Sequence, residues 1–96
     1  MRRNARVDAN QSEIVKALRK HGAHVLITSQ LKNAFDILVG YKGKLYIVEI
    51  KDGSKVKSNR KLTQGEQKCA DGFESVGVTY HVIESVEQAL EMINND

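Results

Sequence analysis

Apolar residues recur along the chain with two different periods, and these periods predict helices and strands. From about Gln11 to His21 they return every three or four residues, which predicts an amphipathic helix that ends at Gly22. A second helical stripe follows Thr63 and ends at Gly77, and a third follows Ser85. Short runs rich in β-branched residues predict four strands, at residues 24–28, 35–39, 44–51 and 78–83.

The resulting order, α-β-β-β-α-β-α, predicts an α/β fold with a mixed sheet. Residues 40–43 (Gly-Tyr-Lys-Gly) indicate a hairpin turn between the second and third strands. The helix between the third and fourth strands demands a parallel pair, because only a crossover returns the chain in the same direction. At 96 residues the chain is too short for two hydrophobic cores, so we expect a single domain over residues 1–96.

Charged residues inside the predicted strands need an explanation. Glu49 and Lys51 are two residues apart, so they project from the same face of a strand, while Ile50 faces the other way. A hairpin closed over residues 41–44 places Asp36 directly opposite Glu49. Opposed carboxylates repel each other by on the order of 4 kcal/mol near 4 Å at an effective dielectric of about 20.

A divalent cation turns this repulsion into binding, because Mg²⁺ prefers oxygen ligands and takes one or two carboxylates with water and phosphate oxygens. Lys51 could then help to deprotonate an attacking water or neutralise the charge that develops on a phosphate. The alternative is structural: Asp36 opens a strand edge, and Glu49 and Lys51 lie on a solvated face.

The charge of the chain is divided unevenly along its length. Residues 1–68 contain all 15 Lys and Arg residues and six of the 12 Asp and Glu residues, whereas residues 69–96 contain the other six acids. This segregation favours a nucleic-acid partner over a merely solvated surface. The candidate phosphate contacts follow the acidic site and are Lys55, Lys57, Arg60, Lys61 and Lys68, with Arg2, Arg3 and Arg6 as a basic tail.

Other chemistry finds little support in the sequence. The single cysteine, Cys69, excludes an intrachain disulfide, and no apolar run is long enough for a signal peptide or a membrane span, so we expect a cytoplasmic protein. His21, His24 and His81 lack the spacing of a metal site.

The chain resembles the virus-type replication-repair nuclease (VRR-NUC) domain of the PD-(D/E)xK superfamily, in its stand-alone phage or bacterial form. The resemblance spans nearly the full length. Its motifs are Glu13 in the first helix, Phe35-Asp36, Glu49-Ile50-Lys51-Asp52, Lys61-Leu62-Thr63 and Val76-Gly77. Phe35 stands where the motif name has proline, which keeps the strand and changes no reacting group.

The resemblance implies a restriction-endonuclease-like core with a defined set of roles. Asp36 and Glu49 would bind the metal ion together with the backbone carbonyl of Ile50. Lys51 would be the catalytic lysine. The implied cofactor is Mg²⁺, with Mn²⁺ as a substitute.

Three further residues have open roles. Glu13 would complete the acidic site from the first helix, but it fits equally well as the capping partner of Asn10. Glu66 stands where the family usually has a glutamine in the second helix, and Gln67 is the next residue; either could support the metal ligands. Glu66 either assists the metal or caps the second helix with Thr63.

The function implied by the resemblance is that of a Mg²⁺-dependent endonuclease that hydrolyses phosphodiester bonds in branched or structured DNA. Its sharper version is a homodimer that cuts four-way (Holliday) junctions. Two alternatives remain: a restriction-type nuclease on the same core, and a catalytically silent nucleic-acid-binding module.

Overall fold

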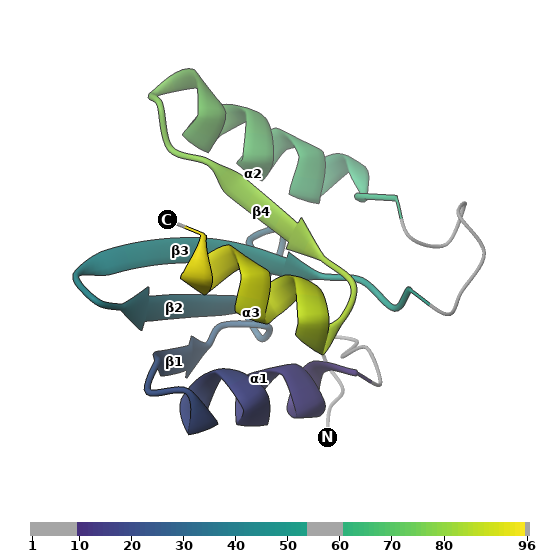
Figure 1. Ribbon diagram of the computed structural model, residues 1–96. Helices are drawn as coiled ribbons and strands as arrows, with labels where there is room; N and C mark the ends of the chain where they lie inside the picture. The colour runs from purple at the N-terminus through teal and green to yellow at the C-terminus, as the bar shows by residue number, and fades with distance from the viewer. Residues whose placement is uncertain (1–9, 54–60, 96) are drawn as a thin grey trace.

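The computed structural model describes residues 10–53 and 61–95, which form a four-stranded sheet and three helices (Figure 1). The predicted element order is confirmed. The elements are α1 (Gln11–Lys20), β1 (His24–Ile27), β2 (Ile37–Tyr41), β3 (Lys44–Ile50), α2 (Gln64–Ser75), β4 (Tyr80–Ile83) and α3 (Val86–Asn94).

The sheet is mixed, with the spatial order β1-β2-β3-β4. β1 with β2 and β2 with β3 are antiparallel, whereas β3 and β4 are parallel. The helix α2 makes the crossover between the two parallel strands, as a parallel connection requires. The antiparallel hairpin and the parallel pair therefore share β3, the strand that carries Glu49.

A two-residue turn joins β2 to β3. Lys42 and Gly43 both have positive φ angles, 49° and 81°, the conformation of the tight turns whose twist matches paired strands. The turn fixes a register in which Tyr41 pairs with Lys44 and Ile37 with Val48. β2 begins two residues later than predicted and runs through the glycine-tyrosine pair, because these two residues still pair with β3.

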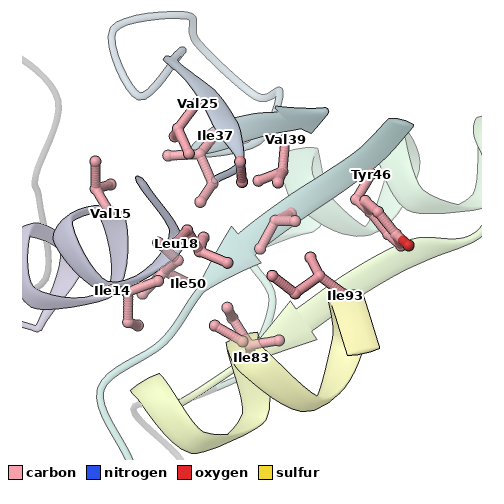
Figure 2. Packing of buried hydrophobic residues seen from close by; sticks show 13 residues of the cluster. Ile14, Val15, Leu18, Val25, Ile37, Val39, Tyr46, Ile50, Ile83 and Ile93 are labelled. Carbon is pink, nitrogen blue, oxygen red and sulfur yellow. The ribbon is translucent and has the colours of Figure 1, made fainter. Parts of the chain in front are cut away.

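The helices divide between the two faces of the sheet, with α1 and α3 on one face and α2 on the other (Figure 1). The main core lies under α1 and α3, where side chains of both helices meet the sheet (Figure 2). Burial of one such side chain stabilises the fold by about 1.5–3 kcal/mol relative to its exposure. The largest side chains with almost no exposure are Ile14, Leu18, Ile37, Val39, Val48 and Ile50.

A smaller core lies under α2. Ala70 of α2 packs with Ile47 and Tyr80 of the sheet, and Phe73 meets Phe35 edge to face with ring centroids 6.3 Å apart. The helix covers this face only in part. The candidate catalytic residues lie on this second face, because alternate residues of β3 point to opposite sides.

The start of α1 differs from the prediction. Asn10 does not form a capping box with Glu13, since its side chain makes no cap hydrogen bond. Its Nδ2 donates instead to the carbonyl oxygens of Lys51, at 3.2 Å, and Glu84, at 2.9 Å. Asn10 thus ties the start of α1 to the end of β3 and to the segment before α3.

Candidate active site

Asp36 lies opposite the strand that carries Glu49, as the sequence predicted. Asp36 lies one residue before β2, and its N–H donates to the carbonyl of Val48 at 3.0 Å. Its Oδ2 accepts a hydrogen bond of 2.7 Å from the N–H of Ile50. The Asp36 carboxylate is therefore oriented by the backbone of β3, next to Glu49.

Glu49 is buried against the second face, with only 3% of its surface exposed. The hydroxyl of Tyr80, on β4, lies 3.3 Å from Glu49 Oε1 and 2.8 Å from the carbonyl oxygen of Ala34. A phenol has one proton to donate, so Tyr80 shares it between these acceptors. Tyr80 thereby links Glu49 to the segment that leads into Asp36.

The electrostatics at Glu49 are those of a crowded, buried carboxyl group. Burial, followed by the negative charges of Asp36 and Glu66, raises the pKa of Glu49 from 4.5 to about 9 against the opposing effect of Lys51. Without a bound metal ion Glu49 is therefore protonated at neutral pH. A cation placed between Asp36 and Glu49 would stabilise the charged form.

Lys51 lies on the same face as Glu49, one residue beyond β3. Its Nζ is 2.9 Å from Glu66 Oε1 and 3.4 Å from Glu49 Oε2. Burial works to lower the pKa of Lys51, but the hydrogen bond to Glu66 and the charge of Glu49 outweigh it and raise the pKa. Lys51 is therefore held as an ammonium between two carboxyl groups.

Glu66 caps α2, one of the two roles left open by the sequence, and it also contacts Lys51. Its Oε1 accepts a 2.9 Å hydrogen bond from the Thr63 N–H, and the Thr63 hydroxyl accepts one from the Glu66 N–H, which completes a capping box. The same oxygen contacts Lys51. Burial works to raise the pKa of Glu66, but the hydrogen bonds from Thr63 and Lys51 lower it overall. Its assistance to a metal ion stays a prediction.

The carboxyl groups of Asp36, Glu49 and Glu66 line a hollow of about 210 Å³, which we call the acid hollow. Its lining consists of Ser29, residues 31–36, Glu49 and Glu66. The segment between β1 and β2 forms one wall, and the carboxyl groups of Glu49 and Glu66 form another. Asp36, the last residue of that segment, lies directly before β2 and lines the hollow.

The first helix presents Gln11 rather than Glu13 toward this region. Glu13 is exposed on α1, and its catalytic role stays a prediction. Gln11 is only 5% exposed, and its Nε2 lies 3.5 Å from the hydroxyl of Ser29, which lines the acid hollow. The sequence analysis did not identify Gln11. It lies on the same helical stripe as Ile14 and Val15, and a polar residue on an apolar stripe indicates a buried polar contact.

The remaining predicted residues lie elsewhere. Gln67 is exposed and donates to Asp71 at 2.9 Å along the outer side of α2, so it does not line the acid hollow. Lys61 and Lys68 are exposed, and Lys68 borders a separate shallow depression with Gln67. The other predicted phosphate contacts lie outside the described residues: Lys55, Lys57, Arg60, Arg2, Arg3 and Arg6.

The donor set suits Mg²⁺. Asp36 and Glu49 supply carboxylate oxygens, the hard donors that this ion prefers. Within residues 10–53 and 61–95, no three His, Cys, Asp or Glu side chains are grouped as a metal-binding set. A metal ion would therefore rely on the two carboxylates, with backbone, water or phosphate oxygens completing its coordination, as the predicted role of the Ile50 carbonyl requires.

Comparison with known proteins identifies the fold. No family model matches the sequence, and no curated protein matches it. In the part of the chain that the structure describes, no helix is both long and apolar enough to cross a membrane. The structure is similar to a solved structure described as a VRR_NUC domain, with a TM-score of 0.64 and 21% sequence identity, over 90% of this chain and 96% of that one. The chain therefore has the VRR-NUC domain fold, a nuclease-type fold, and the resemblance seen in the sequence is confirmed at the level of fold.

Proposed function

We propose that this chain is a Mg²⁺-dependent endonuclease that hydrolyses phosphodiester bonds in DNA. One observation carries the proposal: Asp36, directly before β2, and Glu49, on β3, line one hollow, and the ammonium group of Lys51 lies 3.4 Å from Glu49. Folding alone does not require a buried carboxyl group beside another carboxylate. The raised pKa of Glu49 means that this arrangement disfavours its charged form.

Each residue has a distinct task in this proposal. Asp36 and Glu49 would hold the ion, and Ile50 would orient Asp36 through its N–H and offer its carbonyl. When bound, Mg²⁺ supplies positive charge to the phosphate and makes water a better nucleophile at neutral pH. Tyr80 keeps Glu49 at a fixed place relative to the segment that carries Asp36.

Lys51 would act on the phosphate that is attacked. An ammonium group has three N–H donors, so contacts with Glu66 and Glu49 leave it able to donate to a phosphate oxygen. There it would offset the negative charge that develops as water attacks phosphorus. Glu66 holds the ammonium group at the edge of the hollow, which makes it a positioning residue for Lys51.

The preferred substrate in this proposal is branched DNA, and the active form is a homodimer. A four-way junction has two symmetric scissile phosphates, whereas one domain of 96 residues carries one such site. The excess of Lys and Arg in residues 1–68 supports binding to DNA through phosphates, which recognises shape more than sequence.

The test is cleavage of labelled four-way junction, flap, single-stranded and linear duplex DNA with Mg²⁺, Mn²⁺, Ca²⁺ or EDTA. We expect cleavage with Mg²⁺ or Mn²⁺ only. Glu49→Gln and Lys51→Met should each lower the rate by roughly 10²-fold or more, because the first removes a ligand of the metal ion and the second removes the positive charge that faces the phosphate. The matched control is Glu87→Gln, an exposed residue of α3 on the other face of the sheet, which should cleave like the wild type.

Two outcomes would refute the metal-dependent nuclease. One is robust cleavage in EDTA, which would rule out the metal mechanism. The other is DNA binding with no cleavage of any substrate under any metal, which would favour a catalytically silent binding module. Sedimentation of a monomer at micromolar concentration, with and without junction DNA, would remove the homodimer and leave the nuclease.

A further inference from the structure

One wall of the acid hollow exposes an apolar side chain. Leu31 is 59% exposed, and it lines the same hollow as Asp36 and Glu49. A single exposed leucine on a protein surface is ordinary. Leu31 is unusual because it lies beside three carboxyl groups, on a segment that is held firmly in place.

Three hydrogen bonds fix the segment that carries Leu31. The N–H of Thr28 donates to the carbonyl of Asp36 at 2.8 Å, and the Thr28 hydroxyl donates to the carbonyl of Phe35 at 2.8 Å. The N–H of Leu31 donates back to the carbonyl of Thr28 at 2.9 Å. The turn is therefore closed on itself and tied to the residue that would bind the metal ion.

The far side of the segment is fixed against α2. Asn33 adopts a left-handed conformation with φ of 56°. Its side chain packs so closely on Gly65 that a Cβ at position 65 would overlap it. Gly65 immediately precedes Glu66, so the segment is braced between the two elements that supply Asp36 and Glu66. Leu31 thus projects from a rigid support.

Lys32, the next residue, supplies charge on the same wall. Among the described residues that line the acid hollow, Lys32 is the one cationic side chain, and it is exposed. A phosphate that approaches the carboxyl groups of this hollow needs neighbouring positive charge. Lys32 can provide that charge from outside the metal site.

We propose that Leu31 and Lys32 are the residues that select DNA with unstacked bases. Leu31 packs against a base exposed at a branch point, while Lys32 binds the adjacent phosphate. Apolar side chains such as leucine act as wedges between bases that are already partly unstacked, whereas an intact duplex presents no free base face to them. The inference rests on the proposed function and names the feature of the substrate that this site reads.

A second copy of the chain is the competing occupant of Leu31. A copy seated there would cover the acid hollow and bring like charges of two molecules close together. A DNA strand instead brings phosphates, which the metal ion, Lys51 and Lys32 would neutralise. Charge complementarity therefore favours nucleic acid at this wall.

The test compares Leu31→Ser, Leu31→Met and Lys32→Ala with the wild type and with Leu45→Ser. Leu45 is 69% exposed and lines a separate depression at the other end of β3, so it is the matched control. Binding is measured in Ca²⁺ by fluorescence anisotropy on a four-way junction and on a linear duplex of the same length. A fluorescent adenine analogue at the branch point reports unstacking, and cleavage in Mg²⁺ is measured in parallel.

We expect Leu31→Ser to weaken junction binding by roughly tenfold, because the apolar contact with the unstacked base is lost, and to leave duplex binding unchanged. The analogue should brighten with the wild type and with Leu31→Met but not with Leu31→Ser. Lys32→Ala should weaken binding to both DNAs and flatten the plot of log K against log salt by about 0.9, the value for one lost phosphate contact. Leu45→Ser should match the wild type.

Two results would overturn the inference while the nuclease stands: equal junction preference in Leu31→Ser and wild type, or a wild-type dimer that Leu31→Ser converts to a monomer. Failure of the wild type to cleave any DNA in Mg²⁺ would instead refute the proposed function. Circular dichroism of Leu31→Ser confirms that the variant is folded. If it is not, Leu31→Ala, which shortens the same exposed side chain, takes its place in the test.

Discussion

At the scale of single residues, Glu49 has the most unusual environment in the described structure. It is buried beside Asp36, accepts a hydrogen bond from Tyr80 and contacts Lys51. The sequence predicted the opposition of the two carboxyl groups, because a two-residue turn fixes the register of a hairpin. It could not predict Tyr80 as a partner, since that contact spans 31 residues and depends on the parallel pairing of β3 with β4.

Stability of the metal-free protein should depend on pH through Glu49. Its pKa rises from 4.5 to about 9 on folding, so between these values the folded state binds more protons than the unfolded state. Stability from this group is therefore complete below about pH 4.5 and is lost as the pH rises through about 9. The lowered pKa of Glu66 acts in the opposite direction, but only at acidic pH.

The measurement is urea denaturation without divalent ions from about pH 6 to about pH 9. Wild-type stability should fall over this range, and Glu49→Gln should fall less, because glutamine has no proton to lose. Equal slopes for the two proteins would mean that Glu49 is an ordinary carboxylate.

At the scale of elements, the local sequence pattern predicts the capping contacts of α2 correctly and those of α1 incorrectly. The Thr63–Glu66 capping box follows from residue spacing alone, and the structure contains it. The same pattern at Asn10 and Glu13 led to a wrong prediction. The carbonyl groups of Lys51 and Glu84, 41 and 74 residues away, are acceptors for the Asn10 side chain that no local pattern reveals.

The hydroxyl group of Tyr80 links β4 to the segment that precedes β2, and removing this hydroxyl tests the link. We expect Tyr80→Phe to raise the Mg²⁺ concentration needed for half-maximal cleavage several-fold, because Glu49 loses the donor that places it. The loss in folding stability should be about 1 kcal/mol, the usual net value of one hydrogen bond.

The control is Tyr41→Phe, at the start of the turn between β2 and β3, which should leave the Mg²⁺ requirement unchanged. A Tyr80→Phe enzyme with a lower maximal rate but the same Mg²⁺ requirement would show that Tyr80 does not position Glu49.

At the scale of the whole molecule, the two faces of the sheet have different tasks. The face under α1 and α3 holds the main core, and α3 exposes Glu87 and Glu91 there. The face under α2 holds the acid hollow. In the proposed function, DNA binds on this second face because the hollow lies there. Periodicity predicted the element order, but which residues of the β1–β2 connection line the hollow depends on tertiary packing.

Thermal melting of the wild type and of Asp36→Asn over a series of Mg²⁺ concentrations tests whether Asp36 and Glu49 form a metal site. The amide oxygen of asparagine can still accept the Ile50 N–H, so the substitution removes mainly charge. Without metal at about pH 9, where Glu49 ionises, Asp36→Asn should be more stable by about 1 kcal/mol, because the repulsion between two carboxylates is lost. Added Mg²⁺ should raise the melting temperature of the wild type and barely change that of the variant, since a ligand stabilises the state that binds it. Parallel melting curves for the two proteins at every Mg²⁺ concentration would contradict the metal site.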